Sequence, residues 1–139
     1  KSKSSGNSNV RMDKITEGQE GLGEKLKEMM EGKKKGNKGM SKEFAQAAAR
    51  QAALRKALEE IKKSQDEQGK GAGGLQELID QMDKIEVDLV NKRLNNEMLK
   101  RQKDIVTRLL EAEKADRQRE LDKKRLAERT RDKERKYPP

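Results

Sequence analysis

The chain contains no histidine, no cysteine and no tryptophan, and it has only one phenylalanine and one tyrosine. Histidine and cysteine are common metal ligands, and they supply the usual base at neutral pH and the strongest nucleophile. Without cysteine, no disulfide scaffold can form. We therefore expect no enzyme activity, no catalytic residue, no metal site and no bound cofactor.

Apolar residues are also scarce, because they make up 29% of the chain and aromatic residues only 1%. Phe44 and Tyr137 are the whole aromatic inventory, although aromatic side chains normally supply much of the buried area of a core. Charged residues, in contrast, make up 44%. This composition leaves two possibilities, which are thin contacts between helices or disorder.

The charge is basic but mixed, with 35 lysines and arginines against 26 acidic residues and a net charge of +9. Interleaved charges are typical of solvated helices that are stabilised by pairs at i,i+4. Nucleic acid is not the expected partner, because aromatic residues that could stack on bases are nearly absent. A basic helical protein that binds an anionic polymer, either nucleic acid or envelope polysaccharide, remains the alternative function.

The first forty residues, 1–40, are predicted to be a flexible lead-in rich in glycine and lysine. A weak helical pattern begins near Val10, but Gly18, Gly21 and Gly23 interrupt it, and each costs about 1 kcal/mol relative to alanine in a helix. We therefore expect only a short helix, over about 23–31. A basic loop punctuated by glycine follows at 32–39.

Residues 41–110 carry the strong helical patterns, with helices predicted over about 42–68, 75–91 and 95–110. Ser41 is a favoured N-cap residue for the first of them. Its two seam positions recur every seven residues, as in a coiled coil; they hold Phe44, Gln51, Leu58 and Gln65, and Ala47, Leu54, Ile61 and Gln68. Glycines at 69–74 end this helix. The second helix has one apolar face, made of Leu75, Leu78, Ile79, Met82, Ile85 and Leu89.

The apolar stripe changes phase at 91–96, where Asn95 or Asn96 can serve as an N-cap. The pattern predicts a tight turn between two helices, and a stutter in one continuous helix is the alternative. Beyond Leu110 the apolar pattern fades, and residues 111–139 are predicted to be a charged extension held helical by ion pairs. The predicted fold is all-α: a thin antiparallel helical bundle, or coiled coil, with a long projecting C-terminal helix.

One apolar stripe is predicted to bind a partner. Its apolar residues occur as consecutive pairs along the helix, so the stripe is wide enough to contact two neighbours at once. One neighbour is an internal helix, and the other is a protein partner or a second copy of the chain. The residues assigned to this docking stripe are Leu94, Met98, Leu99, Ile105, Val106, Leu109 and Leu110. Four acids on neighbouring turns, Glu77, Asp80, Asp83 and Glu86, could in principle act as acid and base or hold a cation. We interpret them as the solvated side of their helix.

Several runs of sequence resemble the C-terminal region of large Bacteroidota cell-envelope proteins of unknown function. They are MSKEFA at 40–45, QAALRKAL at 51–58, DLVNKR at 88–93, LKRQ at 99–102 and TRLLEAEKA at 107–115. The resemblance covers about residues 40–125 and supplies no catalytic residue. It implies a membrane-anchored parent protein with a long helical part in the periplasm; a cytoplasmic location stays open.

No apolar run here approaches the ~20 residues that span a bilayer, so any membrane contact would come from parts of the parent outside this chain. The ends, Lys1 and Tyr137-Pro138-Pro139, are expected to be cuts from a longer protein. Together these observations predict a non-enzymatic interaction or scaffold module of a larger cell-envelope protein.

Overall fold

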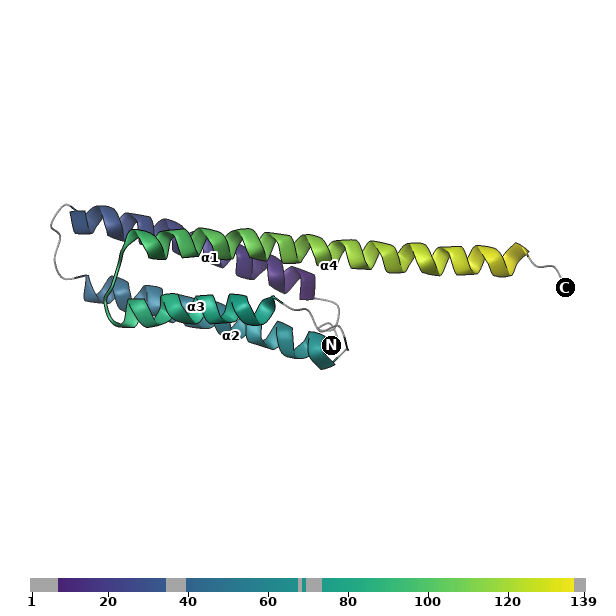
Figure 1. Ribbon diagram of the computed structural model, residues 1–139, viewed down its shortest axis with the longest axis horizontal. Coiled ribbons are helices and arrows are strands. Elements are labelled where there is room, and N and C mark those ends of the chain that lie inside the picture. Colours follow the sequence, from purple (N-terminus) through teal and green to yellow (C-terminus); the bar gives the residue numbers. More distant parts are fainter. Residues whose placement is uncertain (1–7, 35–39, 68, 70–73, 137–139) are drawn as a thin grey trace.

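The computed structural model describes residues 8–34, 40–67, 69 and 74–136, and it describes side chains within 12–33, 40–67, 69 and 74–131. These residues form four α-helices and no strand: α1 (Ser8–Lys34), α2 (Ser41–Glu67), α3 (Leu75–Val90) and α4 (Asn96–Lys136). The prediction of an all-α antiparallel bundle with a projecting C-terminal helix is confirmed (Figure 1).

The helices alternate in direction, and each packs against two others around the bundle. The contacts join α1 to α2 and α4, and α3 to α2 and α4, so α1 and α4 form one pair that lies on the pair made by α2 and α3 (Figure 1). At 1.5 Å per residue, α4 is ~60 Å long whereas α1 and α2 are each ~40 Å. The surplus of α4 leaves the bundle at the end where α1 and α3 begin.

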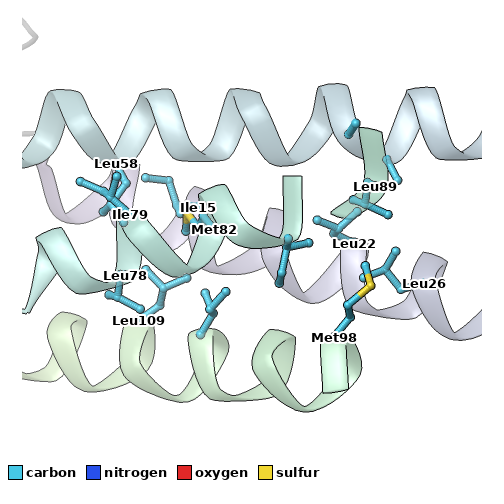
Figure 2. Close-up of a cluster of buried hydrophobic side chains, with 14 of the residues drawn as sticks. Ile15, Leu22, Leu26, Leu58, Leu78, Ile79, Met82, Leu89, Met98 and Leu109 are labelled. Carbon is cyan, nitrogen blue, oxygen red and sulfur yellow. The ribbon is translucent and has the colours of Figure 1, made fainter. Parts of the chain in front are cut away.

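The core is a continuous seam of aliphatic and methionine side chains from all four helices (Figure 2). Leu22 and Leu26 of α1 lie near Met98 of α4, and Leu78 of α3 lies beside Leu109 of α4. Burying a side chain of this size stabilises the fold by about 1.5–3 kcal/mol. The fully buried ones are Met12, Leu22, Leu26, Leu58, Ile61, Met82, Ile85, Leu89, Met98, Ile105 and Leu109.

The prediction for the N-terminal region was wrong within the described residues, because α1 is a full helix of 27 residues rather than a short one over 23–31. Its buried residues recur every seven positions, as Met12, Gln19 and Leu26, and as Ile15, Leu22 and Met29. This heptad pattern buries enough apolar surface to outweigh three glycines. Of the predicted lead-in and basic loop, residues 1–7 and 35–39 lie outside the described residues.

Two of the α1 glycines are sites of close approach. A Cβ on Gly18 would lie 2.6 Å from Leu54 Cδ2 in α2, and a Cβ on Gly23 would lie 2.6 Å from Gln102 Nε2 in α4. Both distances are shorter than a van der Waals contact. These glycines therefore let α1 settle against its two neighbours, and they do not break the helix.

The other three helices begin and end close to their predicted bounds. For α2, the Met40 carbonyl accepts the first helical bond from Phe44 N at 2.9 Å, so Met40 takes the cap position predicted for Ser41. The predicted seam of α2 is buried except for Leu54, which is half-buried, and Gln68, which lies outside the described residues. Of the glycine-rich stretch, residues 70–73 also lie outside them.

The turn predicted between α3 and α4 is confirmed over residues 91–95. Lys92 adopts a left-handed conformation with φ 58°. Its N–H bonds Leu89 O at 3.0 Å, and Arg93 N bonds Asp88 O at 2.8 Å. This pairing is a Schellman motif, which ends a helix and reverses the chain. Asn95 Oδ1 then accepts a hydrogen bond of 3.0 Å from Met98 N, so Asn95 is the N-cap of α4.

Candidate functional site

The structure divides the predicted docking stripe into an inner and an outer row. Its inner residues Leu94, Met98, Ile105 and Leu109 are all at most 3% exposed and belong to the core. For these four the prediction is corrected: they face α1 and α3, which close over this side of α4, and a partner could reach them only if the bundle opened. The outer residues are Leu99 and Val106, which are half-buried, and Leu110, which is 44% exposed.

Two residues of the outer row border a groove between α1 and α4 with a volume of about 720 Å³. On the α4 side, its apolar lining residues are Leu99 and Val106, and its polar ones are Gln102, Lys103 and Thr107. Glu17, Glu20, Gly21, Gly23, Glu24 and Lys27 line it on α1. We call this feature the α1–α4 groove.

Gly21 differs from Gly18 and Gly23, because a Cβ built on it meets nothing within 4 Å. It is exposed at the α1–α4 groove and lies in the interior of a helix. Glycine there costs about 1 kcal/mol relative to alanine. Nothing within the described residues of this chain explains the cost.

The outward side of α1 carries five exposed glutamates spaced three or four residues apart, which we call the acidic stripe: Glu17, Glu20, Glu24, Glu28 and Glu31. At this spacing they lie on one face of the helix. None of them forms an ion pair with another described residue. Three of the five line the α1–α4 groove, so the wall of the groove on α1 is mainly acidic.

A layer of three buried glutamines crosses the core and joins α1, α2 and α4. Gln19 Nε2 donates to Gln51 Oε1, and Gln51 Nε2 donates to Gln19 Oε1, both at 2.9 Å. Gln19 Nε2 also donates to Gln102 Oε1, and Gln102 Nε2 donates to the Gln19 carbonyl. Every side-chain amide in this glutamine layer has a partner, so the layer fixes which positions of the three helices face each other.

A second polar contact joins α1 to α4 at the end of the bundle where α4 leaves it. Glu113 is only 7% exposed, and the Thr16 hydroxyl donates a hydrogen bond to it. Burial raises the pKa of the Glu113 carboxyl, and a hydrogen bond with the Asp13 carboxyl raises it further. The Thr16 hydroxyl and the Arg117 guanidinium, 3.8 Å away, act in the opposite direction on this pKa. Sequence patterns gave no sign that Glu113, within a charged run, is buried.

Another hollow, of about 730 Å³, lies between the beginning of α3 and the middle of α4. Its wall includes Gln65, whose Oε1 is buried without a hydrogen-bond partner among the described residues. Arg108 is held there by Glu77 at 2.8 Å and by Asp104 at 3.2 Å. Since its guanidinium already has two carboxylate partners, this hollow presents paired charges and not a free anion site.

The four acids of α3 are engaged in surface pairs. Glu86 bonds Arg55 at 2.9 Å, and Asp83 lies 3.9 Å from the same guanidinium. Glu77 pairs with Arg108, and Asp80 accepts a hydrogen bond of 3.0 Å from Gln76. No cluster of three or more acidic residues that could hold a metal occurs in the part of the chain that the structure describes.

Beyond Asp116, α4 continues as an arm, residues 117–136, most of which projects past the other three helices (Figure 1). Every side chain described in it, from 117 to 131, is exposed, including Leu121 at 49% and Leu126 at 63%. The arm holds ten basic and five acidic residues, a net charge of +5 out of +9 for the chain. Ion pairs were expected to hold this region helical, and two of them, Glu113–Arg117 and Asp116–Arg119, are present where the arm begins.

Comparison of the chain with protein-family models, with curated proteins and with solved structures gives no match in any of the three. Among the described helices, none combines the length and the apolar character that a membrane span requires.

Proposed function

We propose that this chain is a non-enzymatic helical interaction module, in which a four-helix bundle holds a rigid charged arm and docks a helical partner along the outer side of α4. The observation that carries the proposal is the continuity of α4. One helix supplies core residues such as Met98 and Ile105 and then extends ~30 Å past the bundle. A helix anchored in this way is held by its packed half, so its free half needs no packing of its own.

The outer row of α4 supports the docking half of the proposal. Leu99, Val106 and Leu110 are apolar and reach solvent on a helix whose inner row already fills the core. Leu99 and Val106 border a groove, and Leu110 lies one helical turn beyond Val106. Clustered apolar surface of this kind marks interaction sites.

Spin-label distances test whether the arm is rigid. The chain has no cysteine, so introduced thiols are the only ones present. Labels at Lys103→Cys and Arg131→Cys, diluted with unlabelled protein, should give one narrow distance near ~42 Å, since 28 residues of helix separate them. Lys42→Cys with Lys63→Cys, within the packed helix α2, is the matched control, near ~32 Å. A broad distribution at shorter distances in the arm, beside a narrow one in α2, would refute the proposal.

The concentration of positive charge in the arm favours one second candidate, which is binding of an anionic polymer. Such binding would release counterions, so the affinity should fall steeply between low and moderate salt. Docking through Leu99 and Val106 should change little over the same range. Titration with a polyanion such as heparin at several salt concentrations separates the two functions.

The resemblance to envelope proteins adds a compartment to the proposal: the module would belong to a larger, membrane-anchored protein with this part in the periplasm. Only the resemblance supports this part of the proposal. Protease treatment of intact cells with a permeabilised outer membrane should then digest this module while cytoplasmic markers survive. Protection of the module under those conditions would place it elsewhere.

A further inference from the structure

We propose that the helical partner is a second copy of this chain, docked antiparallel along α4, so that the arm of each copy lies in the α1–α4 groove of the other. This inference rests on the proposed function and names its partner. It joins two features of the same chain that carry opposite charge, which are a basic arm and a groove with an acidic wall.

The lengths of the two features match. Asp116 is the midpoint of α4, with 20 residues on each side. In an antiparallel pair that overlaps over the full helix, the arm of one copy therefore spans the packed half of α4 in the other, ~30 Å in each case. The arrangement has two-fold symmetry, so the same contact forms twice and the assembly closes as a dimer.

Charge complementarity identifies the arm as the occupant. The acidic stripe on α1 has no ion pair within the described residues, and the arm has a net charge of +5. Because α1 is antiparallel to α4, the arm of the partner copy would run parallel to α1. Lys124 and Arg131 of the arm are seven residues apart, as are Glu17 and Glu24 of the groove. Both cations can therefore face both acids at once.

Small and apolar residues lie within one residue of the same register. Between those two cations, on the same side of the arm, lies Ala127, and between the two acids lies Gly21, which has open space above it. A small residue on each helix permits the backbones to approach closely, which accounts for a glycine that no intramolecular contact explains. At this overlap Leu121, which is 49% exposed, comes within one residue of the level of Leu110 in the other copy, which is 44% exposed.

A charge-swap experiment tests the proposal. The wild-type chain should have the mass of a dimer in light scattering, and the dimer should persist at moderate salt because Leu99, Val106 and Leu110 add apolar contact that salt does not screen. The groove variant Glu17→Lys with Glu24→Lys, and the arm variant Lys124→Glu with Arg131→Glu, should each dimerise about tenfold more weakly or worse. Mixed one to one, these two variants should form a heterodimer, because each arm then meets a groove of opposite charge.

The matched control is Lys56→Glu with Lys63→Glu, the same charge change at the same seven-residue spacing on the exposed side of α2. It should leave the dimer intact. A variant that simply unfolds is recognised by loss of helical circular dichroism, and the restored heterodimer cannot arise from unfolded chains.

A monomeric wild type at all accessible concentrations would overturn the inference, and so would a dimer that both charge variants leave unchanged. Open-ended polymers would overturn the two-fold closure. The proposed function would survive each of these outcomes if the spin-label distance in the arm stays near ~42 Å, so the two failures are distinguishable.

Discussion

Gln19 of α1 and Gln51 of α2 exchange two side-chain hydrogen bonds of 2.9 Å each in the centre of the bundle. The pair is closed, since each amide donates to the other and accepts from it, and Gln102 of α4 completes the layer. A polar layer in an otherwise apolar seam favours one register of the helices over those shifted by a heptad.

Removing Gln19 should therefore destabilise the fold more than its size suggests. Gln19→Ala leaves both side-chain atoms of the Gln51 amide and the Oε1 atom of Gln102 buried without partners, although Gln102 Nε2 keeps its bond to the carbonyl of residue 19. Each unsatisfied group costs about 1–3 kcal/mol. We expect a loss of about 2–5 kcal/mol, measured by urea denaturation. Replacing all three glutamines by leucine should instead preserve or raise the unfolding free energy, but broaden the amide signals in NMR spectra as other registers become populated. A Gln19→Ala chain as stable as the wild type would show that the layer contributes nothing.

Two glycines on the same helix should respond to alanine with opposite signs. Gly23→Ala places a Cβ 2.6 Å from Gln102 Nε2 and should cost about 1–3 kcal/mol, as overpacking does. Gly21→Ala enters open space and should stabilise α1 by about 1 kcal/mol. Urea denaturation in the Lys124→Glu, Arg131→Glu background keeps dimer formation out of the comparison. Equal effects at the two positions would contradict the packing described for Gly23.

Consecutive apolar residues of α4, one in the inner row and one in the outer row, test which row is buried in the core. Ile105→Asp places a charge at a fully buried position and should abolish cooperative unfolding and most of the helical signal. Val106→Asp, one residue along, should retain the helical signal and weaken only association. Circular dichroism together with sedimentation measures both. Loss of the fold in Val106→Asp would show that the outer row also belongs to the core.

The pH dependence of stability should reflect Glu113. Burial raises its pKa in the folded chain above the value in the unfolded chain, so the folded state binds the extra proton over the interval between the two values. The contribution of this proton is fully present below the unfolded pKa and is lost as pH rises through the folded one. Glu113→Gln should remove this contribution, so the difference in unfolding free energy between variant and wild type should grow in favour of the variant from pH 4 to neutral. A difference that stays constant with pH would refute the assignment.

The left-handed residue in the α3–α4 turn gives a simpler prediction. Lys92 has φ 58°, which a side chain with a Cβ adopts at a cost of roughly 1 kcal/mol relative to glycine. Lys92→Gly should therefore raise the unfolding free energy by up to about 1 kcal/mol. The matched variant Lys100→Gly, within helix α4, should lower it by a similar amount. If both variants lose stability equally, the Schellman geometry is not the native one.

Local patterns in the sequence were sufficient for three of the helices and for the turn between α3 and α4. Asn95 and Asn96 were both recognisable as possible caps, because short polar side chains stand where the apolar stripe changes phase, and the structure selects Asn95. The full length of the first helix was not predicted, because the low helix propensity of Gly18 and Gly23 is visible in the sequence. The close packing that these glycines permit is not visible there, since only the fold brings Leu54 and Gln102 near them. The heptad through Met12, Gln19 and Leu26 was present, but its glutamine concealed it.

The error over the first helix also explains the error over the docking stripe. If the residues before Gly23 lay outside the bundle, one side of the inner row of α4 would be exposed to solvent. Once α1 runs the full length of the bundle, Ile105 and Leu109 have neighbours on both flanks, and only the outer row stays open. A doubled apolar position indicates two neighbours, but it does not tell whether both belong to the same chain.

The unbroken course of α4 from the glutamine layer into the arm has a mechanical consequence. A force applied at the tip meets no hinge before it reaches Gln102, so it acts on the bundle as a torque with a lever of ~30 Å. Bending the tip of the arm therefore tilts or shears the packed helices. Conversely, breaking the hydrogen bonds of the glutamine layer lets α4 tilt and so displaces the tip.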